Sequence, residues 1–194
     1  MEHLLLLIKK HFLLILVIVI PVTLYITGLQ TEAIGRVQQL LLWTNILTPN
    51  IEPVTNEKKV MARYDFAIYD LDGQKVPFTS FKGKTVFINF WATWCPPCIA
   101  ELPNINKLYK KIKSEKVAFV ILSVDRNPDL VPEFVNKRGF TFPVYILKDT
   151  LPAVYKISSI PSTYVISPQG EIVFNNKGMA NYDSKFFMDF LVQL

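Results

Sequence analysis

The sequence predicts an α/β fold in which helices flank a central mixed β-sheet, behind an N-terminal apolar helix. Residues 85–91 and 117–124 are nearly continuous runs of apolar, β-branched and aromatic residues, which is typical of strands buried on both faces. Between them, residues 96–114 place apolar side chains at helical spacing. A strand, a helix and a strand in this order form a right-handed crossover between parallel strands.

Turn and cap residues divide the rest of this region into short elements. A β-hairpin extension should open it, because residues 70–73 are Asp-Leu-Asp-Gly between two strand-like runs. Gly139 should end a helix, and Ser-Pro-Gln-Gly at 167–170 should turn a second hairpin. The expected elements are strands at 65–69, 75–78, 143–147, 162–166 and 171–175, and helices at 129–138 and 183–194.

The N-terminal segment, residues 1–30, is expected to be a signal-anchor or transmembrane helix. Its apolar run at 12–29 would be roughly 27 Å long as a helix, barely enough to span a bilayer. The Lys9-Lys10 pair precedes the run, which keeps the N-terminus in the cytoplasm and exports the rest. Cleavage as a signal peptide near Ala33 is the alternative. Either way, the remaining chain lies outside the cytoplasm.

Residues 31–60 are expected to join this segment to a domain at 61–194. Ile34, Val37, Leu41 and residues 44–47 recur at helical spacing, which indicates a short amphipathic helix. This helix either lies on the membrane, packs on the domain or serves as a plain stalk. The polar run at 55–59 is typical of a linker.

Composition excludes several classes of site. Cys95 and Cys98 are the only two cysteines, too few for a disulfide-stapled scaffold or a four-cysteine zinc site. Both histidines, His3 and His11, precede the domain, so no histidine-based triad or metal site is expected in it. The net charge of +5 comes from 21 basic and 16 acidic residues, of which 16 basic and 12 acidic residues are interspersed along the domain, so no nucleic-acid partner is expected.

The spacing of Cys95 and Cys98 makes a reversible dithiol/disulfide couple the leading hypothesis. Two intervening residues bring the Cα atoms within the roughly 4.4 to 6.8 Å that a disulfide accepts. Cys95 follows a strand and precedes a helix, where unpaired amides and the helix dipole favour a thiolate, so it is the candidate nucleophile. Pro96 and Pro97 suit the first helical turn and leave the Cys98 amide as the nearest donor. Cys98 would then resolve the mixed disulfide. A metal clip and a structural disulfide remain alternatives.

Three further residues are candidates for supporting roles. Glu101 lies one turn after Cys98, where it either carries the proton of the resolving thiol or is a solvated helix carboxylate. Asn89 is a polar residue in the buried strand and is expected to be a satisfied structural amide. Pro161 directly precedes a strand, and the residues alone favour a trans bond there.

The combination of these motifs resembles the TlpA/ResA group of membrane-anchored thioredoxin-like proteins, over about residues 61–194. The residues that carry the resemblance are FWATWCPPC at 90–98 with Asn89 before it, Gly-Lys at 83–84, Glu-Leu-Pro at 101–103, Ser-Val-Asp at 123–125 and Ile-Pro-Ser-Thr at 160–163. The resemblance implies a thioredoxin-like fold in which Pro161 is cis and lies against the cysteine pair. It also implies that Trp94 and Ile160 contact substrate and that Glu101 takes part in the redox cycle. Thioredoxins proper carry a buried acid where Asn89 stands, which moves proton handling toward Glu101 or water.

The function that the resemblance implies is an exported, membrane-tethered thiol-disulfide oxidoreductase. It would reduce disulfides in client proteins, with cytochrome c maturation as one client pathway, and a membrane electron donor would reduce its Cys95–Cys98 disulfide. No metal and no cofactor beyond this disulfide is expected. The redox domain is expected on the periplasmic face of a bacterial inner membrane. A disulfide oxidase or isomerase is the main alternative; a thiol peroxidase and a copper(I) or zinc chaperone that uses the two thiolates are less favoured.

Overall fold

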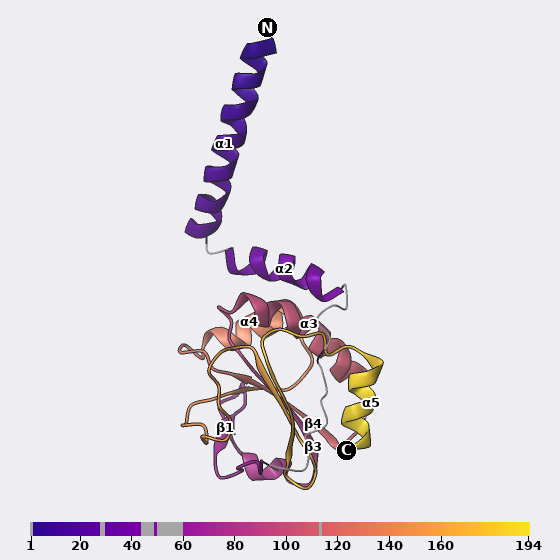
Figure 1. Ribbon diagram of the computed structural model, residues 1–194. Coiled ribbons are helices and arrows are strands. Elements are labelled where there is room, and N and C mark those ends of the chain that lie inside the picture. Colours follow the sequence, from indigo (N-terminus) through magenta and orange to yellow (C-terminus); the bar gives the residue numbers. More distant parts are fainter. Residues whose placement is uncertain (1, 28–29, 44–48, 50–59, 113) are drawn as a thin grey trace.

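The computed structural model describes residues 2–27, 30–43, 49, 60–112 and 114–194 (Figure 1). A seven-stranded sheet forms its centre, in the order β2-β1-β5-β4-β3-β6-β7. The strands are β1 (Ala67–Tyr69), β2 (Lys75–Pro77), β3 (Thr85–Trp91), β4 (Val117–Ser123), β5 (Val144–Ile146), β6 (Ser162–Ile166) and β7 (Ile172–Lys177). The sheet is mixed, as the sequence predicts.

The central strands have the predicted parallel arrangement. β3 and β4 pair in parallel from Thr85 opposite Val117 to Trp91 opposite Ser123, and α3 (Pro96–Lys111) connects them. β4 also pairs in parallel with β5, through α4 (Leu130–Arg138). β6 and β7 form the predicted antiparallel hairpin beside β3, and β1 and β2 form the hairpin at the other edge. Every residue of β3 is buried, so this strand lies in the middle of the core.

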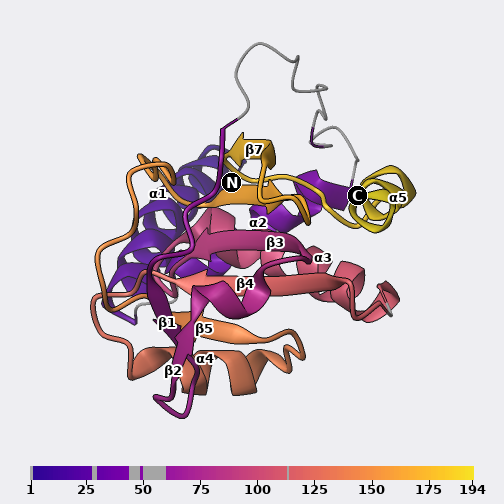
Figure 2. The ribbon, with the colours of Figure 1, turned by 90° about the horizontal axis from the view of Figure 1, so that it is seen from below.

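Different elements pack against the two faces of the sheet. Phe87 and Trp91 of β3 belong to the cluster that packs under α3, α4 and α5 (Lys185–Gln193). Val86 and Ile88 alternate with them and belong to the opposite cluster, which includes the 3-10 helix η1 (Phe78–Phe81) and Tyr155. Because side chains alternate along a strand, Asn89 points toward the helical face, where α3 lies. Figure 2 shows the sheet between these covers.

Several boundaries differ from the expected ones for local reasons. α3 ends at Lys111 instead of residue 114, because Ile112 is already extended at φ −81° and ψ 101°. α5 begins at Lys185, because Ser184 is the N-cap and its Oγ accepts from the Phe187 amide at 3.1 Å. Gly139 ends α4 in the left-handed conformation at φ 63°, as predicted.

Two helices precede the domain, α1 (Glu2–Ile26) and α2 (Gln30–Trp43). α2 lies across the outside of α3, and α1 extends away from the domain (Figure 1). α2 thus begins before residue 34, and it packs on the domain, one of the three arrangements considered above. Residues 44–47 and the expected linker at 55–59 lie outside the described residues. Within the part of the chain that the structure describes, no helix is sufficiently long and apolar for a membrane span.

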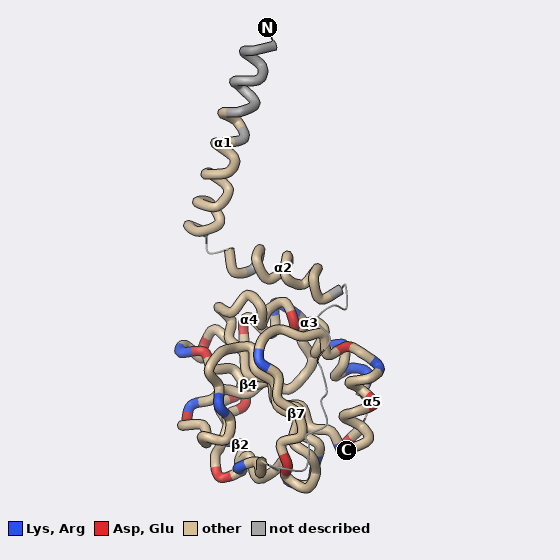
Figure 3. Tube along the Cα trace, viewed as in Figure 1, with Lys and Arg blue, Asp and Glu red and all other residues tan. Residues whose placement is uncertain are grey.

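Charged residues of both signs are distributed over the surface of the domain, whereas the described side chains of α1 include none (Figure 3). Ion pairs such as Lys111 with Asp183 and Lys185 with Asp189 join neighbouring residues of opposite sign. The positive net charge therefore does not form a single-sign field over the domain.

Candidate active site

The two cysteines lie at the junction between the central strand and α3, joined by a disulfide with a Cα–Cα distance of 5.3 Å. Cys95 is the N-cap of α3, and the Cys98 amide donates a hydrogen bond to its Sγ at 3.3 Å. Pro96 and Pro97 occupy the first helical positions, where amide donors would have no intrahelical partner. The predicted spacing and the predicted nearest donor are both confirmed. Cys95 is 4% exposed and Cys98 is fully buried, so Cys95 is the more exposed of the two cysteines.

The Ile160–Pro161 peptide bond is cis, as the family resemblance implies and against the trans bond that the residues alone favour. Pro161 directly precedes β6, whose first residue Ser162 pairs with Phe90 near the end of β3. The proline therefore lies beside the strand end from which the chain continues to Cys95. Ile160 packs against the hydrophobic cluster that contains both cysteines.

Trp94 directly precedes Cys95 and is 58% exposed, although Ala92 and Cys95 are buried. The Cys95 amide donates to the Ala92 carbonyl at 3.2 Å, which closes a turn around Thr93 and Trp94. A large apolar side chain is thereby presented at the surface next to the disulfide.

Glu101 is fully buried, which corrects the view of it as a solvated helix carboxylate. Its Oε1 accepts from Asn89 Nδ2 at 2.7 Å, and its Oε2 accepts from the Ala180 amide at 3.1 Å. Burial raises the pKa of Glu101 from 4.5 to about 8, and the two hydrogen bonds offset part of that rise. Glu101 therefore holds a proton at neutral pH and is poised to exchange it.

Asn89 connects the redox helix to the strand that follows Pro161. Its Nδ2 donates to Thr163 Oγ1 at 2.9 Å as well as to Glu101, whereas its Oδ1 has no hydrogen-bond partner among the described residues. The expectation of a fully satisfied amide is therefore only half right. A half-turn of the amide would present Oδ1 as an acceptor to protonated Glu101, so Asn89 can serve either protonation state.

Asp125 is a residue whose role the sequence analysis missed. Its carboxylate accepts from the Thr93 amide at 3.0 and 3.2 Å, from Thr93 Oγ1 at 2.6 Å and from Ser123 Oγ at 2.8 Å. It comes just after β4, and these contacts fix the turn that carries Trp94 to Cys95. The one available signal was its place after a strand parallel to β3, because parallel strands end at the same edge of the sheet.

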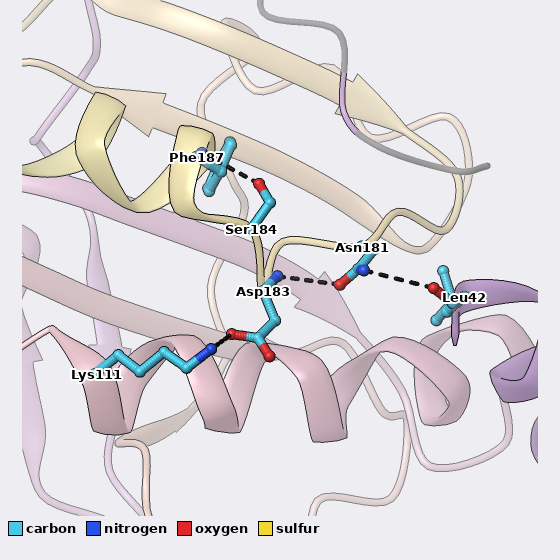
Figure 4. A network of polar contacts seen from close by, with 6 residues as sticks. All are labelled: Leu42, Lys111, Asn181, Asp183, Ser184 and Phe187. Atoms are coloured by element: carbon cyan, nitrogen blue, oxygen red, sulfur yellow. Dashed lines mark hydrogen bonds and ion pairs between the residues drawn. The ribbon is translucent and has the colours of Figure 1, made fainter. Parts of the chain in front are cut away.

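A second missed element is the segment between β7 and α5, shown in Figure 4. Ala180 supplies the amide for Glu101, and the adjacent Asn181 donates from Nδ2 to the Leu42 carbonyl of α2 at 3.4 Å. Asp183 forms an ion pair with Lys111 at the C-terminal end of α3. This segment therefore links the buried acid, the redox helix and α2. No sequence motif marks it.

The arrangement can carry out dithiol chemistry with its own residues, since the Cys95–Cys98 pair can give two electrons once it has been reduced, and Glu101 is a titratable group in the same helix. Within the described residues, no three or more side chains of His, Cys, Asp or Glu gather as ligands for a metal ion.

Comparison with known proteins gives a consistent result. A model of the AhpC/TSA family matches residues 61–175, more than half of the chain. Thiol-disulfide oxidoreductase ResA of Bacillus thuringiensis is 39% identical over 110 residues, which are 56% of this chain and 64% of that protein. The chain thus spans less than two thirds of this relative. ResA of Halalkalibacterium halodurans is 34% identical over 129 residues, covering 66% of this chain and 73% of the relative.

Solved structures of related proteins have a similar fold. A thioredoxin-family thiol:disulfide interchange protein from Chlorobium tepidum has a TM-score of 0.61 and 26% identity, over 71% of this chain and 99% of that one. StoA from Bacillus subtilis has a TM-score of 0.52 and 28% identity, over 60% of this chain and 89% of that one. With its family match, its thioredoxin-like fold and a disulfide at the expected place, this chain belongs to the AhpC/TSA family and is related to the proteins named ResA.

Proposed function

We propose that this chain reduces disulfide bonds in exported proteins by thiol-disulfide exchange. The observation that carries the proposal is the Cys95–Cys98 disulfide at the N-terminus of α3, in the same helix as the buried acid Glu101. Client proteins would approach at Trp94 and along the backbone beside Ile160 and Pro161. These are the substrate contacts that the family resemblance implies.

The proposed exchange proceeds in two steps. The Cys95 thiolate attacks one sulfur of a client disulfide, forming a mixed disulfide and releasing the other client sulfur as a thiolate. In the fraction of molecules in which Glu101 is ionised, Cys98 then loses its proton to the Glu101 carboxylate and attacks Cys95 Sγ, which releases the second client sulfur as a thiolate. The client gains two electrons and the protein becomes the Cys95–Cys98 disulfide. A dithiol donor in the membrane reduces that disulfide for the next cycle.

We further propose that the N-terminal segment attaches the protein to a bacterial inner membrane, with the redox domain outside the cytoplasm. The apolar run after Lys9-Lys10 and the exposed apolar side chains of α1, among them Val17 and Tyr25, support this proposal. Alkaline extraction of cell membranes tests the attachment, and protease digestion of spheroplasts tests the orientation. Recovery of the full chain in the soluble fraction would contradict the attachment.

The decisive experiment for the chemistry uses the purified full-length protein in detergent, with insulin as a disulfide probe. The wild-type protein, reduced beforehand, should reduce insulin stoichiometrically. Cys98→Ser should accumulate a mixed disulfide with insulin on Cys95, visible by mass spectrometry, whereas Cys95→Ser should form none. Adducts of equal yield on both variants would contradict the assigned roles.

Cytochrome c maturation is the client pathway that we propose on the family resemblance. A strain without this protein should lose haem-stained c-type cytochromes, and Cys95→Ser should fail to restore them. Normal cytochrome content in the deletion strain would exclude this pathway while leaving the exchange chemistry intact.

A further inference from the structure

Helix α2 presents its apolar side away from the domain. Gly35 and Leu42 are buried, and residues seven apart lie on the same side of a helix. Val37 comes two residues after Gly35, about 200° around the helix axis, and it is 64% exposed. Ile34 and Leu40 flank it at helical spacing and are 50% and 54% exposed. Ile34, Val37 and Leu40 are called the outer stripe below.

The inner side of α2 is small and polar by comparison. Apart from Leu42 it contains Gly35 and the half-buried Gln38 and Gln39. A helix that packed on a domain and otherwise faced water would have the opposite arrangement, with apolar residues inside and polar residues outside. The outer stripe therefore calls for a second apolar surface.

The structure indicates which surface that is. Residues 27–29 alone separate α2 from α1, whose exposed side chains include Ile18, Tyr25 and Ile26. α1 leaves α2 on the side away from the domain, so α2 lies between α1 and the redox domain (Figure 1). The apolar surface that receives α1 is thus available to the outer stripe as well. A side-on helix with one apolar face is the form in which chains bind the boundary between lipid headgroups and acyl chains.

We propose that α2 lies on the lipid surface through Ile34, Val37 and Leu40, and so holds the redox site directly against the membrane. This inference rests on the proposed membrane attachment and extends it to the class of client.

Two contacts fasten α2 to the redox machinery. At Gly35 the two helices approach so closely that a Cβ atom would lie 3.2 Å from the Pro96 carbonyl oxygen and 3.3 Å from Ile99 Cγ2. At the other end, the Leu42 carbonyl accepts from Asn181, next to the residue that donates to Glu101. Pro96 directly follows Cys95, so the disulfide would stand about one helix diameter, roughly 10 Å, from the lipid surface. At this distance from the lipid surface, the disulfide can react with client proteins whose own disulfides lie close to the membrane.

Depth-dependent fluorescence quenching tests the inference. A small fluorescent amino acid replaces Ile18, Val37, Leu40 or Val192 in turn, in the full-length protein reconstituted into phosphatidylcholine and phosphatidylglycerol vesicles. Val192 is the matched control, because it is an apolar residue of α5 with 55% exposure. Lipids with brominated acyl chains should quench emission at positions 18, 37 and 40 but leave position 192 unquenched.

The other outcomes distinguish the lipid contact of α2 from the membrane attachment of the N-terminal segment. Quenching at position 18 without quenching at 37 and 40 would overturn the inference and leave membrane attachment standing. Absence of quenching at all four positions would overturn both. Emission at position 37 that shifts with protein concentration in detergent, without any lipid, would assign the stripe to a second copy of the chain and overturn the inference.

A functional arm uses one disulfide peptide in two forms, either soluble or attached to vesicle lipid through a short linker. Val37→Glu should slow reduction of the attached peptide several-fold and leave reduction of the soluble peptide unchanged. Val192→Glu introduces the same charge on α5 and should change neither rate. Equal loss on both peptides, or no loss on either, would contradict a role for α2 at the lipid surface.

Discussion

The amide of Asn89 donates a hydrogen bond to the carboxylate of Glu101 at 2.7 Å, between the central strand and the redox helix. Both side chains are fully buried. With the Ala180 amide, Asn89 supplies the polar contacts that a buried carboxylate requires, yet burial still raises the pKa of Glu101 to about 8. Glu101 is therefore mostly protonated at neutral pH, and its ionised fraction grows as the pH rises toward 8.

The first prediction concerns stability and pH. The pKa of Glu101 is about 8 in the folded protein against 4.5 for an ordinary glutamate, so between these values the folded state holds a proton that the unfolded state releases. The stabilisation by the protonated form is complete below about pH 4.5 and is lost as the pH rises through 8. The free energy of unfolding of the oxidised protein should therefore fall by about 1.4 kcal/mol per pH unit in this window.

Glu101→Gln should remove this dependence, because glutamine does not titrate. Urea unfolding of the oxidised protein at several pH values between 5 and 8 measures it. Glu133→Gln, an exposed position on α4, is the matched control and should keep the wild-type slope. Identical slopes in the wild type and in Glu101→Gln would show that Glu101 is not the titrating group.

The second prediction concerns the hydrogen bond itself. Because the Asn89 amide favours the ionised form of Glu101, Asn89→Ala should raise the pKa of Glu101 further. The limb of the pH profile for insulin reduction that reports deprotonated Glu101 should move to higher pH. Asn136→Ala, on the exposed side of α4, should leave the profile in place. A profile that does not move in Asn89→Ala would exclude Asn89 as a positioning residue for Glu101.

The third prediction concerns the turn before Cys95. In Asp125→Asn, an NH2 group replaces one acceptor oxygen. The Thr93 amide, the Thr93 hydroxyl and the Ser123 hydroxyl can then no longer all donate to this side chain. We expect a loss of about 1–3 kcal/mol in the free energy of unfolding and slower insulin reduction, since the turn positions Trp94 and Cys95. Asp129→Asn, an exposed neighbour, should change neither quantity. If Asp125→Asn keeps the stability and the rate of insulin reduction of the wild type, the hydrogen bonds to Asp125 do not hold this turn.

The fourth prediction concerns the packing of α2 against α3 at Gly35. Gly35→Val places methyl groups against the Pro96 carbonyl, which belongs to the backbone and cannot rotate away. α2 should separate from α3, so amide hydrogen exchange should accelerate over residues 30–43 while the sheet keeps its protection. Leu40→Val changes the outer stripe and should leave exchange unaltered. Slow exchange over α2 in Gly35→Val would mean that this close contact does not hold the helix.

Local patterns predicted much of the fold and the core of the site. The apolar run of β3, the spacing of Cys95 and Cys98 and the proline pair in the first turn are each encoded within a few residues, and each was predicted correctly. The cis bond at Pro161 followed from the family resemblance and not from the residues alone.

The supporting contacts could not be predicted because they join residues far apart in the sequence. Glu101 on α3 accepts a hydrogen bond from Asn89 on β3 and another from the Ala180 amide, which lies in the segment between β7 and α5. Asp125 reaches Thr93 only because β4 runs parallel to β3. The periodicity of residues 34–41 revealed an amphipathic helix, but not that its apolar side would face away from the domain, since periodicity does not say which side meets a partner.

The reduction potential of the Cys95–Cys98 couple tests the central claim most directly, because it decides whether the protein gives electrons to client disulfides or takes them. It can be measured by equilibrating the protein with dithiothreitol buffers and counting thiols by mass spectrometry. For a protein that reduces client disulfides, we expect a potential near the thioredoxin value of about −270 mV. A potential near about −120 mV, typical of a strong disulfide oxidant, would contradict it.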